Sequence, residues 1–271
     1  MAERSDILKS SICNLQYKNR CPSRATLYGR RLGKSLGANG EHVMSYVLDY
    51  IPLILKGMLL TVEVALLSLF ISVVLGMIGA LAKLSKSRLA QIVAGIYTTV
   101  IRGMPDLVLM TLIFFGGQIL VNNIGEKLGF EYIDVSPFVA GVLTIGFIFG
   151  AYMTESFRGG IMAVSRGEIE AGYAFGMTPI QVFLRLTFPA MVRHALPGFG
   201  NNWLVLTKTT ALVSVIGLQD MVYNAGLAGG STRKPFTFYC VVAFLFLIIT
   251  GISDVGVRWM DRRYSVGVRK A

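Results

Sequence analysis

A small set of charged and amide side chains interrupts the long apolar segments of this 271-residue chain. An ionisable group inside a membrane-crossing segment is costly, so such a group is a candidate for binding a ligand. Glu155 suits a positively charged ligand group, and Lys208 suits a carboxylate. The full candidate set is Glu155, Asp106, Asn201, Asn202 and Lys208. These side chains offer non-covalent binding of a polar molecule, and none of them is expected to do chemistry on it.

Each charged member of this set also has a purely structural interpretation. Glu155 lies three residues before Arg158, a spacing that forms ion pairs on a helix, and Arg102 is a second candidate partner. Lys208 has Asp106 and Glu155 as candidate partners. The sequence leaves ligand contact and internal pairing open as alternatives.

The chain offers little for covalent, metal or nucleotide chemistry. Its two histidines have no second ligand nearby for zinc, and its three cysteines show no metal or disulfide spacing. A hydrolase would need a nucleophile and a base at matching depth, but Ser214 lies most of a span from His194. Gly33-Lys34-Ser35 resembles the end of a phosphate-binding loop, yet Tyr28 stands where its first glycine belongs. We therefore expect no catalytic residue and no bound cofactor.

The elements that carry these residues have the composition of membrane helices. Hydrophobic residues make up 54% of the chain and charged residues only 15%, against about 25% charged in a typical soluble domain. Apolar runs of about 20 residues predict an all-α polytopic bundle of five spans. A break at 102–105, ending in Pro105, makes the second span either kinked or the junction of a surface helix with a span. The predicted spans are 57–81, 92–121, 137–154, 196–218 and 236–257.

The distribution of basic residues orients these spans. Lys and Arg concentrate in the loop after the first span, in the segment between the third and fourth spans, and in the C-terminal tail. Cytoplasmic loops of membrane proteins carry such an excess. We therefore expect the C-terminus in the cytoplasm and, with five spans, the N-terminus outside. This rule explains the positive charge of the membrane part better than a nucleic-acid partner does.

Residues 1–43 do not fit this orientation. They hold eight basic and three acidic residues on the predicted outer side, and they lack an apolar stretch for a signal peptide. Our hypothesis is that the membrane domain comprises residues 44–271, beginning near Met44, and that 1–43 are a basic extension, mis-assigned or disordered. Finding residues from before Met44 by N-terminal sequencing of natively expressed protein would contradict it.

Pairs of small residues predict close helix packing in two spans. Gly76 and Ala80 are four residues apart in the first span, as are Gly146 and Gly150 in the third. Small residues at this spacing let membrane helices approach closely. The sequence does not say whether these faces meet each other or a second subunit.

The segment 158–193, between the third and fourth spans, has the most informative pattern. Two short amphipathic helices are predicted on either side of residues 176–179, with Thr178 as N-cap and Pro179 as the first helical residue. By itself this pattern also fits an ordinary hairpin on the membrane surface. Its spacing, however, resembles the EAA signature of bacterial ABC importer permeases: Glu-Ala-Ala, three residues, Gly, nine residues, then Ile-x-Leu-Pro. The matching positions here are Glu170, Ala171, Gly172, Gly176, Leu186 and Phe188-Pro189.

The resemblance extends over nearly all of residues 45–271. This part of the chain is similar to the polar amino acid permease subfamily, nearest to the Q-type subunits of histidine and lysine-arginine-ornithine importers. Opine and neutral polar amino acid permeases remain alternatives, and a channel or an intramembrane hydrolase would be a different class. The stretches that carry the resemblance are "IRGMPDLVLMTLIFFGGQ", "GFIFGAYMTESFRGG", "ALPGFGNNWLVLTKTTALVSVIGLQD" and "RRYSVGVRK".

This resemblance implies a type I ABC importer permease fold in the bacterial inner membrane. It implies a heterodimer with a sister permease, two ATPase subunits that bind ATP and magnesium, and a periplasmic amino-acid-binding protein. In that family the EAA loop is the coupling helix that seats in a groove of the ATPase. The expected function is uptake of basic amino acids by alternating access.

Overall fold

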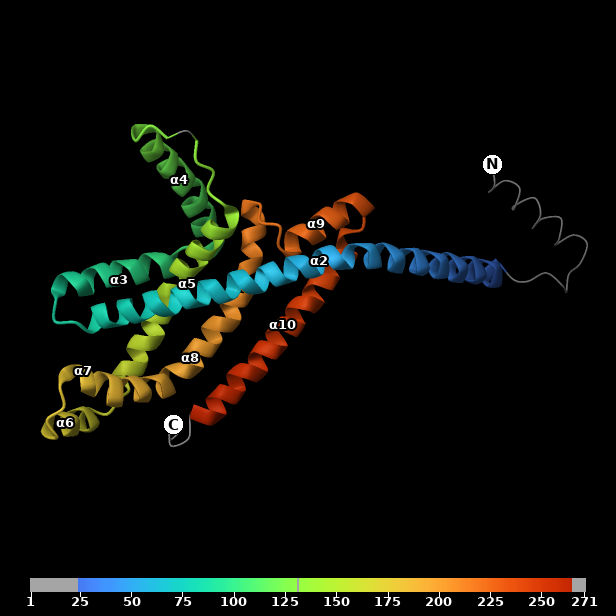
Figure 1. Cartoon of the computed structure of the whole chain (residues 1–271). Coiled ribbons are helices and arrows are strands. Elements are labelled where there is room, and N and C mark those ends of the chain that lie inside the picture. Colours follow the sequence, from blue (N-terminus) through green and yellow to red (C-terminus); the bar gives the residue numbers. More distant parts are fainter. Residues whose placement is uncertain (1–23, 131, 265–271) are drawn as a thin grey trace, which may run out of the picture. The chain divides into compact units, whose positions relative to one another are not determined.

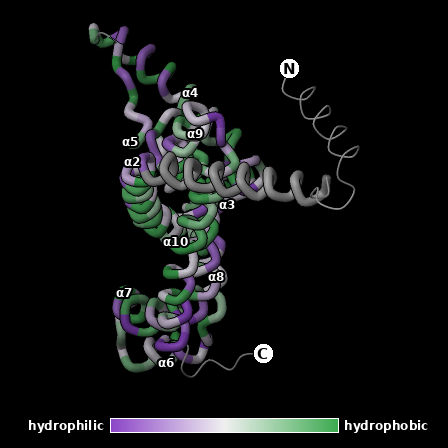
Figure 2. The backbone as a smooth tube through the Cα atoms, turned by 90° about the vertical axis from the view of Figure 1, so that its right-hand side faces the viewer, coloured by the Kyte–Doolittle hydropathy of each residue, from purple (hydrophilic) through white to green (hydrophobic). Residues whose placement is uncertain are grey.

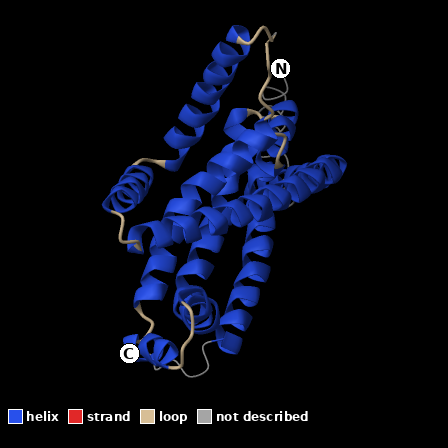
Figure 3. Cartoon of the chain, turned by 60° about the vertical axis from the view of Figure 1, so that its left-hand side comes forward, coloured by secondary structure: helices blue, strands red, loops and turns tan. Residues whose placement is uncertain are grey.

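The computed structural model describes residues 24–130 and 132–264, with side chains from residue 49 onward. The described part is helical and contains no strand (Figures 1 and 3), which confirms the predicted all-α class. The chain divides into two units, residues 1–51 and 52–271. Most of the prediction for 1–43 lies outside the described residues, although helix α2 begins at Arg24. The helices are α2 (Arg24–Leu84), α3 (Arg88–Gly103), α4 (Asp106–Lys127), α5 (Pro137–Met162), α6 (Arg166–Ala174), α7 (Pro179–Val182), η1 (Phe183–Thr187), α8 (Phe188–Thr209), η2 (Thr210–Ile216), α9 (Met221–Thr232) and α10 (Pro235–Tyr264).

Four described helices are long and apolar enough to cross a membrane. They are the Asp49–Leu84 part of α2, then α4, α5 and α10. The segments Pro179–Ile216 and Met221–Thr232 form a pair bent by 53°, which makes a fifth span if it is counted as one. The predicted bundle of about five spans agrees with this result. In Figure 2 hydrophilic residues gather near the α4–α5 connection and around α6 and α7, while hydrophobic residues dominate between them.

The predicted second span is two elements. Helix α3 ends at Gly103, Met104 and Pro105 are extended, and α4 begins at Asp106. Proline lacks an amide N–H and disfavours helical backbone at the residue before it, which explains the break. With 16 residues, α3 is about 24 Å long and too short for a hydrocarbon core of about 30 Å. Only α4 qualifies as a span, so the junction alternative is the correct one.

The predicted fourth span starts later than helix α8, but its end at residue 218 is close to the end of the helical segment at Ile216. Helix α8 begins at Phe188, tightens into the 3₁₀ turn η2 after Thr209, and stops at Gly217, whose φ is +88°. The following stretch, which we predicted as a loop, contains the 12-residue helix α9. Asp220 caps α9 by accepting a hydrogen bond from the Tyr223 amide (2.9 Å).

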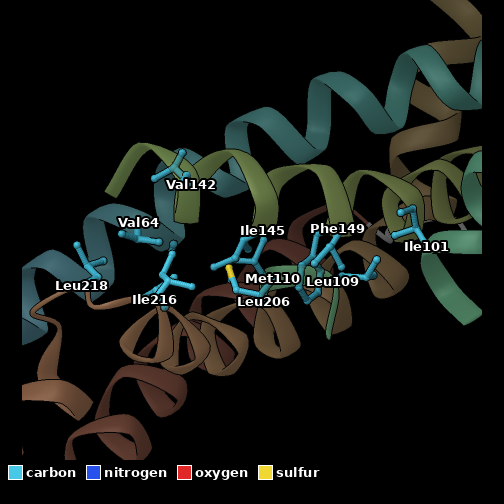
Figure 4. Close-up of a cluster of buried hydrophobic side chains, with 14 of the residues drawn as sticks. Val64, Ile101, Leu109, Met110, Val142, Ile145, Phe149, Leu206, Ile216 and Leu218 are labelled. Atoms are coloured by element: carbon cyan, nitrogen blue, oxygen red, sulfur yellow. The ribbon is translucent and has the colours of Figure 1, made fainter. Parts of the chain in front are cut away.

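Helix α5 forms the centre of the apolar core. About 67% of its most apolar window is buried inside the chain, against 11% for α4 and 6% for α10. Ile145 and Phe149 of α5 pack with Met110 of α4, Leu206 of α8 and Val64 of α2 (Figure 4). The helix that carries Glu155 is therefore held on several sides.

Both small-residue pairs lie at one contact, between α2 and α5. A Cβ atom added at Gly146 would come within 2.7 Å of the Ile71 side chain, and one at Gly150 within 2.9 Å of Leu75 Cβ. On the facing helix, Gly76 abuts Met153. The predicted close packing is therefore confirmed, and these faces meet each other within the chain.

Candidate functional site

The segment 158–193, called the EAA-like segment below, folds as a hairpin between α5 and α8. Two backbone hydrogen bonds close its first turn, from Met177 N to Gly172 O (3.1 Å) and from Gly176 N to Tyr173 O (2.9 Å). Gly176 has a φ of +76°. These bonds and this left-handed residue make a Schellman motif, which satisfies the last carbonyl groups of α6. The glycine of the signature therefore has a backbone reason.

The second arm of the hairpin begins with a complete capping box. Thr178 Oγ1 accepts a hydrogen bond from Gln181 N (3.4 Å), and Gln181 Oε1 accepts one from Thr178 N (2.9 Å). Pro179 occupies the first helical position. The predicted cap and first residue are both confirmed. Each end of the turn is thus satisfied by local hydrogen bonds.

One part of the signature holds the two arms together. Gly172 is buried in α6, and a Cβ atom there would lie 2.6 Å from Leu186 Cδ1 and 3.2 Å from Val182 Cγ2. Because Gly172 has no side chain, the second arm of the hairpin packs directly against α6. Gly172 and Leu186 therefore shape the segment.

The first two residues of the signature are exposed. The same hairpin also exposes apolar side chains that the sequence analysis did not identify. Glu170 and Ala171 are exposed on α6. Phe175 is 85% exposed, Ile180 72% and Leu184 59%. A hairpin that exposes both apolar side chains and a carboxylate is suited to binding a protein partner. No periodic pattern in the sequence points to Phe175. The i, i+4 spacing of Ile180 and Leu184 does indicate that they share one face of a helix.

A single π-helical turn, η1, joins this hairpin to α8. The amide of Phe188 donates to the carbonyl of Phe183, five residues earlier. Pro189 follows and has no N–H to donate to the carbonyl four residues before it, so the wider turn accommodates the proline. Single π turns often occur at functional sites. Pro189 of the signature is exposed and acts here through the backbone.

The base of the hairpin rests on the membrane helices. Val164 packs with Phe157 of α5, with Met191 of α8 and with Ala80 of α2 in one buried cluster. A Cβ atom at Gly160 would lie 2.9 Å from Ala195 Cβ. Displacement of the EAA-like segment would therefore act directly on α2, α5 and α8.

Glu155 is occupied by two cations. Its carboxylate accepts hydrogen bonds from Lys83 of α2 and from Arg158 Nε (3.0 Å). Lys83 Nζ also donates to Thr98 Oγ1 of α3 (2.5 Å). Arg102, the other candidate partner, instead lies over the Tyr152 ring, 5.4 Å from its centroid. The structural interpretation of Glu155 therefore accounts for both of its oxygens.

The two neighbouring asparagines have different surroundings. Asn202 is buried between α8 and α5, where its Nδ2 donates to Ser156 Oγ (3.0 Å). Asn201, the preceding residue of α8, is exposed. Only Asn201 is available to a ligand without breaking an internal hydrogen bond.

Asp106 and Lys208 do not pair with each other or with Glu155 within the described residues. Asp106 is half-buried in the first turn of α4. Lys208 is exposed in the last turn of α8. Within the described residues, no hydrogen bond or ion pair joins any two of the five candidates.

Comparison with known proteins identifies the architecture. A family model described as "Binding-protein-dependent transport system inner membrane component" matches residues 72–266. The chain is 53% identical to the histidine/lysine/arginine/ornithine transport system permease protein HisQ of Escherichia coli, covering 80% of this chain and 96% of that protein. It is 42% identical to the octopine transport system permease protein OccQ of Rhizobium meliloti, covering 78% of this chain and 90% of that protein.

Solved structures show the same fold. A crystal structure of an amino acid ABC transporter with histidines matches with a TM-score of 0.68 at 31% identity, covering 80% of this chain and 96% of that one. The MetNI methionine ABC transporter, in an inward-facing conformation, matches with a TM-score of 0.62 at 17% identity, covering 78% and 96%. The fold is that of type I ABC importer permeases, and the chain belongs to the family of inner-membrane components of binding-protein-dependent transport systems.

Proposed function

We propose that this chain is a permease subunit of an ATP-driven importer of basic amino acids such as histidine, arginine, lysine and ornithine. The observation that carries the proposal is the self-capped hairpin of the EAA-like segment, which exposes Glu170 and Phe175 and rests on three membrane helices. The named substrates of HisQ, at 53% identity, support the substrate class.

The proposed complex contains a sister permease, two ATPase subunits that hold ATP and magnesium, and a periplasmic binding protein. The permease itself binds neither ATP nor metal. Its C-terminus lies in the cytoplasm and its N-terminus in the periplasm, which follows from the basic loops. The loaded binding protein docks outside while ATP closes the ATPases inside, and the EAA-like segment passes that closure to the spans as alternating access.

We assign the substrate path to the polar side chains that have no ion pair within the described residues. Asp106 suits an ammonium group, Lys208 suits a carboxylate, and Asn201 offers a neutral amide. Asn202 and Glu155 were in the same predicted set, but their internal bonds make them weaker candidates for ligand contact. Opine uptake is the second candidate function, favoured by the 42% identity to OccQ.

The test uses the complex of this chain with its sister permease and ATPase in liposomes. ATPase activity is measured with binding protein loaded with arginine, histidine, glutamine or octopine. We expect arginine and histidine to stimulate hydrolysis. Glu170→Lys should abolish the stimulation because it reverses a charge on the exposed part of the hairpin, which we call the docking face. Stimulation by octopine alone would favour the opine alternative. A chain that never co-purifies with an ATPase would contradict the importer itself.

A further inference from the structure

Three helices meet at the carboxylate of Glu155. It binds Lys83 of α2 and Arg158 of its own helix, and Lys83 also binds Thr98 of α3. We call these four residues the Lys83–Glu155 cluster. Its bonds are charge-assisted, which makes them about twice as strong as neutral hydrogen bonds. Moving α2 or α3 separately from α5 would break at least one of them.

The surroundings of the cluster make separation costly. The side chains of Lys83 and Glu155 are only 17% and 21% exposed. Removing one partner of a shielded ion pair leaves an uncompensated charge away from water. In contrast, the Asp254–Arg258 pair lies on one helix, α10, with exposures of 36% and 63%, and it joins no helices.

The cluster stands where the EAA-like segment begins. Helix α5 ends at Met162, two turns beyond Glu155, and α6 starts at Arg166. On the N-terminal side of the cluster along both helices, α2 and α5 are packed in close contact, with Gly79 against Thr154 and Gly76 against Met153. The Lys83–Glu155 ion pair is therefore the last contact in the tightly packed interface between α2 and α5. It lies at the end next to the EAA-like segment, where an ATPase would exert its force.

We propose that Glu155 is a positioning residue for coupling: through Lys83 it makes α2 and α3 move with α5 when the EAA-like segment is displaced. This inference rests on the proposed function and gives Glu155 a role other than substrate contact. Neutralising the pair leaves the hairpin and the ATPase intact but removes the charged link, so α2 and α3 follow α5 less closely. ATP is hydrolysed with fewer amino acids imported.

The experiment measures the number of amino acids imported per ATP hydrolysed by the complete complex in liposomes. The variants are Glu155→Gln, Lys83→Met and the exchanged pair Lys83→Glu with Glu155→Lys, and Asp254→Asn is the matched control. We expect either single variant to lower the ratio by about 2- to 30-fold. The control should keep it, and the exchanged pair should recover part of it. A variant that merely folds less well lowers import and hydrolysis together and leaves the ratio unchanged.

A second readout separates positioning from ligand contact. The preference for arginine over glutamine is measured in the same vesicles, and we expect Glu155→Gln to preserve it. An unchanged import-to-ATP ratio, or a shifted preference, would overturn the inference while leaving the importer assignment standing. Absence of ATP-driven import by the unmodified chain would instead refute the proposed function on which it rests.

Discussion

At Gly176 the backbone turns with a φ of +76°, and two hydrogen bonds between α6 and the turn depend on it. Proline fixes φ near −65° and has no N–H for the Tyr173 carbonyl. We therefore expect Gly176→Pro to uncouple transport, so that import is lost while membrane insertion continues. Import into vesicles and the amount of membrane-inserted protein are the two measurements. Gly167→Ala, in the first turn of α6, is the control that should retain both.

Phe175 is the most exposed aromatic residue of the EAA-like segment, at 85%. Buried aromatic anchors often contribute about 2 kcal/mol to an interface, which corresponds to roughly 30-fold in Kd. We expect Phe175→Ala to weaken association with the ATPase subunit by about that factor. Titration of the purified ATPase onto the permease in detergent measures it. Equal affinity for Phe175→Ala and the control Phe244→Ala, on α10, would remove Phe175 from the docking face.

Residues whose role is local were predictable, and those whose role is distant were not. Thr178 and Pro179 were identified because a cap and a first helical residue act within one turn. Glu155 and Lys83 are 72 residues apart, so no pattern of spacing connects them. Lys83 directly follows the predicted first span, where it reads as one more basic residue of a cytoplasmic loop, and its bond to Thr98 has no signal in the sequence.

At the scale of elements, the π turn η1 sets how the hairpin is rotated relative to α8. Pro189→Ala supplies the N–H that an α-helical turn needs, so we expect η1 to tighten. Each residue of an α-helix turns the chain by about 100°, so closing a π turn to an α turn, which holds about one residue fewer, rotates the preceding segment by about that angle. Import should therefore fall although the chain inserts normally. Electron cryomicroscopy of the assembled complex would show the rotation, and an unchanged π turn would count against this account of Pro189.

The contact between α2 and α5 depends on glycine at position 79. A Cβ atom there collides with both branches of Thr154, whose hydroxyl already donates to the Gly150 carbonyl. We expect Gly79→Ala to destabilise the protein by about 1–3 kcal/mol through overpacking. Gly95→Ala on α3 is the matched control, because no atom lies within 4 Å of its added methyl group. Thermal unfolding in detergent should separate the two, with Gly95→Ala neutral or stabilising.

Long apolar helices were visible in the sequence, whereas their breaks were only partly so. Helix α3 is separate from α4 because Met104 and Pro105 are extended. The proline indicated a break at this point but did not distinguish a kinked span from two separate helices. Helix α9 was missed because its 12 residues include three glycines and follow the left-handed Gly217. Asp220, which caps α9, is the available signal for this helix in the sequence.

For the molecule as a whole, the orientation of the spans can be tested directly. In a variant lacking Cys13, Cys21 and Cys240, a single cysteine is placed at exposed Phe175 or exposed Leu128. We expect a membrane-impermeant thiol reagent to label Leu128→Cys from the periplasm. It should label Phe175→Cys only after the membrane is opened. The reverse pattern would invert the topology and place the EAA-like segment away from any cytoplasmic ATPase.

The hairpin of the EAA-like segment closes its own ends, through the Schellman turn at Gly176 and the capping box at Thr178. Such a segment has already lost most of its conformational entropy before it meets a partner. Docking then costs only the ordering of a few side chains, at about 0.5–1.5 kcal/mol each. In the proposed importer, an ATPase subunit would release and regain the segment in every transport cycle without refolding it.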